Sequence, residues 1–119
     1  MSARTDALKD RLSRYRGIRI TITGRTSGRS ISIPVWFVLD GENLYLLPVQ
    51  GSDTQWYKNV LSNPSIRIDV HGTEADFKVV PITDAKQVSS VVEKFRAKYG
   101  DSGIKLYSKL DVAVIAKMR

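Results

Sequence analysis

Cysteine is absent from this chain of 119 residues, and histidine occurs once, as His71. The absence of cysteine excludes a disulfide framework, a thiolate zinc site and a cysteine nucleophile. With a single histidine, neither a metal centre nor a pair of nucleophile and histidine can be assembled from the usual residue types. We interpret His71 as a surface residue at the tip of a predicted hairpin. If the protein is an enzyme, its difficult chemistry belongs to a bound organic cofactor that the protein holds and orients.

Long apolar runs are also missing. The longest, residues 33–39, is too short to cross a bilayer, and residues 1–19 alternate charged with apolar residues and lack the apolar stretch of a signal peptide. The cytoplasm is therefore the expected location. The length and the evenly spread hydrophobic content of 42% predict one domain over residues 1–119.

The net charge of +7 is concentrated near the N-terminus, because residues 1–29 contribute +6 of it. A local basic field attracts an anionic partner, which is a phosphorylated cofactor, a nucleic acid or an acidic membrane surface. Part of the charge lies on a predicted helix at about residues 5–16, in which Leu8, Leu12 and Tyr15 recur at helical spacing. The apolar face of this helix is narrow, so a weak contact with an anionic membrane is an accessory feature at most.

A turn rich in glycine and arginine, residues 24–29, separates two predicted strands at residues 18–23 and 31–39. Gly24 and Gly28 permit positive backbone dihedrals and a close approach of backbone amides to a ligand. Arg25 and Arg29 supply forked donors that match phosphate or carboxylate oxygens. The same composition is also ordinary for a hairpin, so the turn alone does not decide between the two interpretations.

The rest of the chain alternates between short apolar strands and capped helices. Strands are predicted at residues 44–49, 66–70, 75–80 and 112–116, and the first three strands of the chain are expected to form an antiparallel meander. Ser52 with Gln55 forms a capping-box pattern before one helix, and Asp84 with Gln87 caps a second. The second helix carries a stripe of apolar residues that predicts a buried face, formed by Val88, Val91, Val92, Phe95 and Tyr99. We predict an α+β barrel with about six mainly antiparallel strands and three to four helices.

Several ordered blocks of sequence resemble the deazaflavin-dependent nitroreductase family. These are residues 21–29, the segment Ile33-Pro34-Val35-Trp36-Phe37, the pairs Asp40-Gly41 and Leu44-Tyr45, and the segment Trp56-Tyr57-Lys58-Asn59-Val60-Leu61-Ser62-Asn63-Pro64. The resemblance covers residues 18–82 and implies a split β-barrel related to the FMN-binding pyridoxamine phosphate oxidase proteins. It implies the deazaflavin coenzyme F-420 or FMN as cofactor. Thr26 stands where that family commonly has lysine, and the loop after the third predicted strand is shorter than usual, which leaves both cofactors open.

The resemblance also implies roles for individual residues. Those expected to bind the cofactor are Arg25, Thr26, Ser27, Arg29, Pro34, Val35, Trp36, Val49, Gln50, Gly51, Ser52, Trp56, Asn59 and Val60. Ser52 and Tyr107 are the residues expected to polarise the acceptor or a ring carbonyl. Trp36 and Trp56 also fit a purely structural role in the core, whereas an asparagine inside a helix, as at Asn59, needs a partner for its amide.

The expected function is hydride transfer between the bound cofactor and an electrophilic small molecule such as a quinone, a nitroaromatic or an enone. The alternative is a non-enzymatic small barrel that binds single-stranded nucleic acid or another phosphorylated ligand. Trp36, Trp56 and Tyr57 lie outside the basic segment, which argues against nucleic acid. Split barrels of the FMN type usually dimerise, so the resemblance admits a homodimer.

Overall fold

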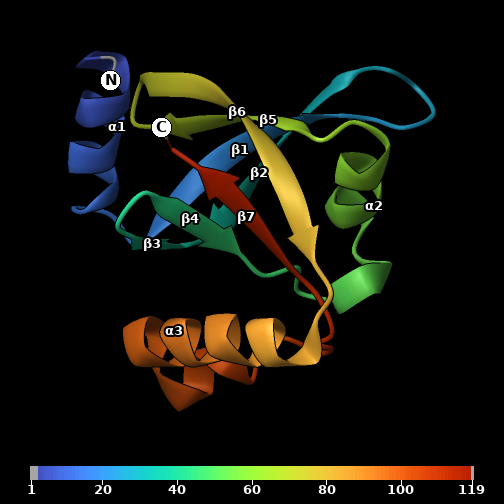
Figure 1. Ribbon diagram of the computed structural model, residues 1–119. Coiled ribbons are helices and arrows are strands. Elements are labelled where there is room, and N and C mark those ends of the chain that lie inside the picture. Colours follow the sequence, from blue (N-terminus) through green and yellow to red (C-terminus); the bar gives the residue numbers. More distant parts are fainter. Residues whose placement is uncertain (1–2, 119) are drawn as a thin grey trace.

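The computed structural model describes residues 3–118. Its elements in chain order are α1 (Ala3–Leu12), β1 (Gly17–Thr23), β2 (Ser30–Trp36), β3 (Val38–Asp40), β4 (Asn43–Leu46), the short 3₁₀ helix η1 (Gly51–Asp53), α2 (Gln55–Ser62), β5 (Ser65–Val70), β6 (Thr73–Ile82), α3 (Ala85–Ile104) and β7 (Ala113–Lys117) (Figure 1). None of the helices in this range is long and apolar enough to span a membrane.

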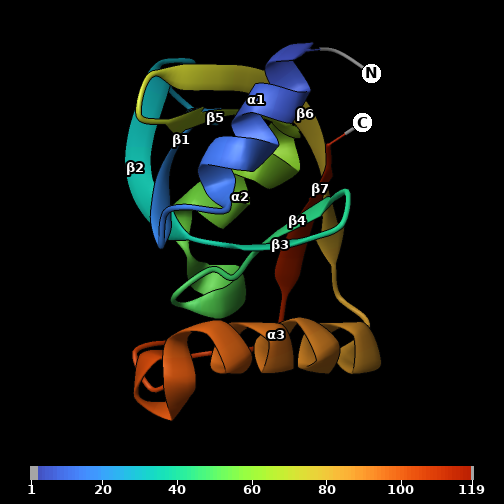
Figure 2. The same cartoon turned by 90° about the vertical axis from the view of Figure 1, so that its left-hand side faces the viewer.

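The seven strands of the described range form one antiparallel sheet in the order β2-β1-β5-β6-β7-β4-β3. The long strand β6 bends the sheet, because residues 73–78 pair with β5 whereas residues 79–82 pair with β7. The two edge strands, β2 and β3, are separated only by Phe37, so the sheet curls round on itself (Figure 2). The prediction of an α+β split β-barrel is confirmed.

Alternating residues of the strands fill the inside of the barrel. In β1, Ile18, Ile20 and Ile22 are buried while the residues between them face outward, and β5 repeats the pattern. Leu8 and Leu12 of α1 enter the same core. The apolar stripe of α3, residues 88–99, packs with the outer face of β3 and β4 in a second core, so its predicted burial is confirmed.

The strand predicted over residues 31–39 is interrupted at Phe37. The Phe37 amide donates to the Tyr99 hydroxyl (3.1 Å), and Lys98 Nζ donates to the Phe37 carbonyl (2.8 Å). These bonds to α3 replace ladder bonds at this position. The expected meander of the first three strands is therefore two hairpins, β1–β2 and β3–β4, that occupy different parts of the sheet.

Helix boundaries follow the sequence signals only in part. Asp84 accepts a hydrogen bond from the Gln87 amide (3.0 Å), which confirms the predicted cap of α3. The N-terminal helix ends at Leu12, not near residue 16, and begins at Ala3. The capping box of Ser52 and Gln55 is wrong, because Ser52 belongs to η1 and Thr54 is the residue that precedes α2.

Candidate functional site

A cavity of about 810 Å³ lies at the open end of the β1–β2 hairpin, where β1 begins and β2 ends. The loop that leads to α2, the end of β5 with its turn, and the segment after α3 complete it. Ligand pockets of roughly 300–1,000 Å³ are typical of small-molecule and cofactor sites. Its lining residues are Gly17, Ile18, Arg19, Pro34, Val35, Trp36, Leu47, Val49, Thr54, Trp56, Asp69, Val70, His71, Gly72, Leu106 and Tyr107. Apolar and aromatic side chains dominate this lining, and few polar groups interrupt them.

Trp36 forms an aromatic side of the cavity that is fixed from behind. Its ring stacks on Tyr99 with centroids 4.2 Å apart and an interplanar angle of 6°. A Cβ on Gly103 would lie 3.2 Å from the Trp36 ring, so glycine lets the end of α3 approach closely. Trp36 thus packs in the second core and also lines the cavity. A structural role and a ligand-binding role are therefore compatible for this residue.

Tyr107 presents the most unusual polar group of the cavity. Its ring is tilted against Trp36 at 6.3 Å and is 9% exposed. Within residues 3–118 the Tyr107 hydroxyl has no hydrogen-bond partner, and burial, aided by nearby Tyr99, raises its pKa. The hydroxyl therefore stays protonated and is available to donate to a ligand.

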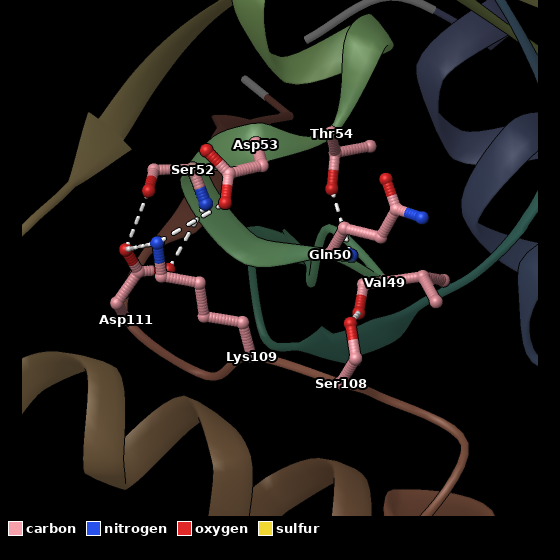
Figure 3. A network of polar contacts seen from close by, with 8 residues as sticks. All are labelled: Val49, Gln50, Ser52, Asp53, Thr54, Ser108, Lys109 and Asp111. Atoms are coloured by element: carbon pink, nitrogen blue, oxygen red, sulfur yellow. Dashed lines mark hydrogen bonds and ion pairs between the residues drawn. The ribbon is translucent and has the colours of Figure 1, made fainter.

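A network of polar contacts joins η1 to the segment after Tyr107 (Figure 3). The Ser52 hydroxyl donates to Asp111 Oδ2 (2.6 Å), and the Ser52 amide donates to Asp111 Oδ1 (2.9 Å). The bond from the Ser52 hydroxyl is the main cause that lowers the pKa of Asp111. Lys109 Nζ lies 3.3 Å from Asp53 Oδ2 and 3.7 Å from Asp111 Oδ2, and this pairing raises the pKa of Lys109.

The same two segments are also joined through their backbones. The Ser108 amide donates to the Val49 carbonyl (2.8 Å), one residue from Tyr107. Gly51 has φ +55°, and a Cβ there would lie 2.1 Å from Asp111 Oδ1, so only glycine fits. The network therefore fixes Val49 and Tyr107 beside each other on one side of the cavity.

The backbone amides of the glycine and arginine turn are largely used within the protein. Gly24 donates to the Arg29 carbonyl (2.8 Å), Gly28 to the Gly24 carbonyl (2.9 Å) and Arg29 to the Ser27 hydroxyl (3.2 Å). The turn therefore offers its arginine side chains to an anion and does not present a ring of free amides. Thr26 is exposed beside them.

Arg25 is fixed to α2 by neutral acceptors. Its guanidinium donates to Asn59 Oδ1 (2.8 Å) and to Gln55 Oε1 (2.9 Å), and its amide also donates to Asn59 Oδ1 (3.1 Å). Asn59 is buried inside a helix, where its side-chain amide requires a hydrogen-bond partner, and Arg25 is that partner. Because both acceptors are uncharged, the guanidinium is oriented while its positive charge is not neutralised.

The cavity brings together some of the site residues predicted from the sequence and leaves others apart. Those that line it are Pro34, Val35, Trp36, Val49, Trp56 and Tyr107. Those that do not are Arg25, Thr26, Ser27, Arg29, Gln50, Gly51, Ser52, Asn59 and Val60. Val60 lies in the barrel core with 1% exposure. The turn follows the Thr23–Ser30 pair, whereas the cavity-lining residues of these strands extend from the Gly17–Trp36 pair to the Arg19–Pro34 pair, which is roughly 13 Å from the turn along an extended strand.

Sequence reasoning missed the residues that β5 and its turn bring to the cavity. Arg19 contributed only to the basic charge of residues 1–29 in the sequence analysis, but it lines the cavity. His71 is exposed at a hairpin tip, as predicted, and it lines the cavity as well. Arg19 lies opposite Asp69 because β1 pairs with β5, about fifty residues later. No local sequence pattern predicts the pairing of β1 with β5.

The sequence matches the family described as "Uncharacterized protein conserved in bacteria (DUF2255)" over residues 10–115. The chain belongs to this family. No curated protein matches the sequence.

Solved structures share the fold of this DUF2255 protein at low sequence identity. An F420-H2 dependent reductase (FDR-A) is 18% identical with a TM-score of 0.67, over 86% of this chain and 94% of the other. A putative pyridoxamine 5'-phosphate oxidase from Listeria innocua is 16% identical with a TM-score of 0.67, over 95% and 90%. A structure described as a domain-swapped dimer is 16% identical with a TM-score of 0.69, over 95% and 98%. The fold implied by the family resemblance is therefore confirmed.

Proposed function

We propose that the protein is a flavin- or deazaflavin-dependent oxidoreductase that transfers hydride between a bound cofactor and an electrophilic small molecule. A quinone, a nitroaromatic or an enone is a suitable acceptor. One observation carries the proposal: a cavity of about 810 Å³ on a split barrel gathers Pro34, Val35, Trp36, Trp56 and Tyr107 from segments far apart in the sequence. Solved proteins of this fold that are described as an F420-H2 dependent reductase and a putative pyridoxamine phosphate oxidase support it.

The residues present fit such a cofactor. Pro34, Val35 and Trp36 offer a flat apolar surface to a ring system. Arg25 and Arg29 carry positive charge that no carboxylate within residues 3–118 neutralises, so they suit the cofactor's phosphate and acidic tail. When bound, the cofactor's ring supplies or accepts the hydride. Because Arg25 and Arg29 do not line the cavity, a ligand that contacts both the cavity and the turn has to extend beyond the cavity, which suits the deazaflavin with its acidic tail.

The chain's own residues would orient and polarise the reactants. Tyr107 is the group that we expect to donate to an oxygen of the acceptor or the ring, because its hydroxyl is protonated and has no partner within the described residues. Ser52, the other residue proposed for this role, has to release Asp111 Oδ2 before its hydroxyl is available. Trp56 and Tyr107 are buried and would limit the contact of the reacting groups with water on their side of the cavity.

Cofactor titration tests the proposed function, and the chain offers an internal probe. Trp36 and Trp56 are the two tryptophans of the sequence, and both line the cavity. We expect coenzyme F-420 or FMN to quench their fluorescence with a submicromolar dissociation constant, and the variants Trp36→Phe and Trp56→Phe to assign the signal. If neither cofactor binds, the proposed function is wrong.

The competing function, a module that binds single-stranded nucleic acid, predicts a different behaviour. A gel-shift assay at two salt concentrations would then show tight binding that weakens steeply as salt rises. For the cofactor-dependent enzyme we expect no such binding. We also propose a homodimer, which a domain-swapped dimer of the same fold supports, and analytical ultracentrifugation of the cofactor-free and loaded protein measures it.

A further inference from the structure

The side of the cavity formed by β1 and β5 carries an arginine without a counter-ion. Arg19 faces outward from β1, lines the cavity and is the direct cross-strand partner of Asp69 on β5. Opposite charges at such positions normally pair. Here Asp69 Oδ1 instead accepts the Gly72 amide (3.0 Å) and closes the β5–β6 turn. Within residues 3–118, Arg19 has no ion pair or hydrogen bond from its side chain, so its charge is free for a ligand.

His71, two residues after the cross-strand partner of Arg19, lines the same cavity and is held in place by two contacts. Its φ of +49° is rare for a residue other than glycine. Its ring stacks on Tyr15 with centroids 3.9 Å apart and an interplanar angle of 20°, and Arg11 Nη1 donates to its carbonyl (3.3 Å). The ring nitrogens have no partner within the described residues. The stacking therefore orients an imidazole N–H donor at the rim of the cavity.

We propose that Arg19 and His71 form a subsite for a carboxylate of the hydride acceptor, so that the preferred substrates are acidic electrophiles; this assignment of substrate class rests on the proposed function. The guanidinium matches a carboxylate in two parallel bonds, and the imidazole adds a third donor. Among residues 3–118, Asp69 is the one carboxylate that lines the cavity, and one of its oxygens accepts the Gly72 amide.

The subsite is separate from the arginines of the turn. Arg19 lies within β1, whereas Arg25 lies two residues beyond the end of that strand and is bonded to Asn59 and Gln55 of α2. The cofactor's phosphate at Arg25 and the acceptor's carboxylate at Arg19 therefore do not compete for the same cation.

Binding of para-nitrobenzoate and of nitrobenzene to the cofactor-free protein tests the subsite without any catalytic turnover. Tryptophan quenching or amide NMR shifts give the two dissociation constants. We expect wild type to bind para-nitrobenzoate about tenfold more tightly than nitrobenzene, as one charge-assisted hydrogen bond allows. Arg19→Gln should reduce this preference to about threefold, the share of His71, and leave nitrobenzene binding unchanged. His71→Asn, in which asparagine tolerates the positive φ, should weaken para-nitrobenzoate about threefold.

Lys86→Gln is the matched control, because it removes one positive charge from the exposed first turn of α3, away from the cavity. Equal affinity for the two nitro compounds, or an equal loss in Lys86→Gln, would overturn the subsite.

Cofactor titration of Arg19→Gln separates the two proposals. Unchanged cofactor affinity supports an acceptor subsite, whereas a loss of cofactor affinity assigns Arg19 to the cofactor and overturns it. If wild type prefers para-nitrobenzoate but binds no cofactor, the anion subsite stands and the proposed oxidoreductase fails.

Discussion

At the scale of single residues, the choice of hydrogen-bond acceptor decides what Arg25 is able to do. Asn59 and Gln55 orient its guanidinium through amide oxygens, whereas carboxylates in their place would neutralise it. By contrast, arginines that form ion pairs, such as Arg67 with Asp76, have their charge compensated on the protein surface. Arg25 therefore combines a fixed geometry with a free charge, which is what an anion site requires.

Replacing Arg25 by alanine should weaken cofactor binding by about 1.5–3 kcal/mol, the usual value of a hydrogen bond to a charged group. The fold should survive, because Asn59 Oδ1 keeps the bond from the backbone amide of residue 25 (3.1 Å). Arg25→Lys keeps the charge but loses the fork, so it should recover only part of the affinity. Fluorescence titration measures the affinity, and thermal unfolding checks the fold. Unchanged affinity in Arg25→Ala would remove Arg25 from the site.

Asn59→Asp tests whether the uncompensated charge of Arg25 binds the cofactor, because it keeps Arg25 and adds a negative charge beside it. A carboxylate at position 59 would accept the same bonds from Arg25, so the protein should remain folded. The ion pair would neutralise the guanidinium, and cofactor affinity should fall about as far as in Arg25→Ala. Undiminished affinity would show that the free charge of Arg25 is not what binds the cofactor.

At the scale of elements, local signals succeeded where the partners are close in sequence. The cap of α3 by Asp84 and its buried stripe from Val88 to Tyr99 were predictable, because each depends on residues within a few turns of one helix. The capping box of Ser52 failed because its hydroxyl binds Asp111, 59 residues away. The break at Phe37 was equally hidden, since Tyr99 and Lys98 of α3 cause it.

The contact between η1 and Asp111 gives the protein a specific acid sensitivity. The Ser52 hydrogen bonds hold the pKa of Asp111 below its ordinary value, so the ionised carboxylate stabilises the folded state. This contribution is complete above the unfolded-state pKa of about 4 and disappears as the pH falls through the lower folded-state pKa. We expect Asp111→Asn to be less stable than wild type at pH 7, by a modest amount because the side chain is partly exposed.

Urea unfolding at pH 7, 5 and 3 measures that difference. The gap between wild type and Asp111→Asn should persist at pH 5 and shrink toward zero at pH 3. Ser52→Ala removes the first cause of the pKa shift, so it should flatten the same dependence while leaving the charge at position 111. A gap that is constant over the three pH values would contradict a role for the ionised carboxylate.

At the scale of the whole molecule, the barrel assembles the cavity from parts that the sequence keeps separate. The fold class and five of the cavity-lining residues were predictable, because ordered sequence blocks carry a family resemblance over residues 18–82, and Tyr107 was predicted from its place near the end of the chain. Arg19, Asp69 and His71 were not grouped, because the β1–β5 pairing joins the two ends of that region. The site thus divides into residues that short motifs mark and residues that only the sheet order brings together.

Helix α1 also contributes to this assembly, because it packs in the core and contacts His71 of the cavity lining. Leu8 and Leu12 are 0% and 1% exposed, Lys9 Nζ pairs with Glu42 Oε1 at 2.5 Å, and Arg11 binds the His71 carbonyl. Both leucines of α1 and two of its cations are therefore engaged within the protein. This arrangement leaves little of the helix for the anionic membrane contact that its charge suggested.

We expect Leu12→Ala to lower the free energy of unfolding by about 2–5 kcal/mol, as for other fully buried leucines. Leu61→Ala is the matched control, since Leu61 is also helical but 52% exposed, and it should change stability little. Urea unfolding gives both values, and co-sedimentation with anionic and neutral vesicles tests the membrane contact on wild type. If Leu12→Ala were as mild as Leu61→Ala and wild type sedimented with anionic vesicles, α1 would be a detachable lipid-binding helix. A large loss of stability without vesicle binding means that its leucines hold the helix on the barrel, and with it the Arg11 contact that supports His71.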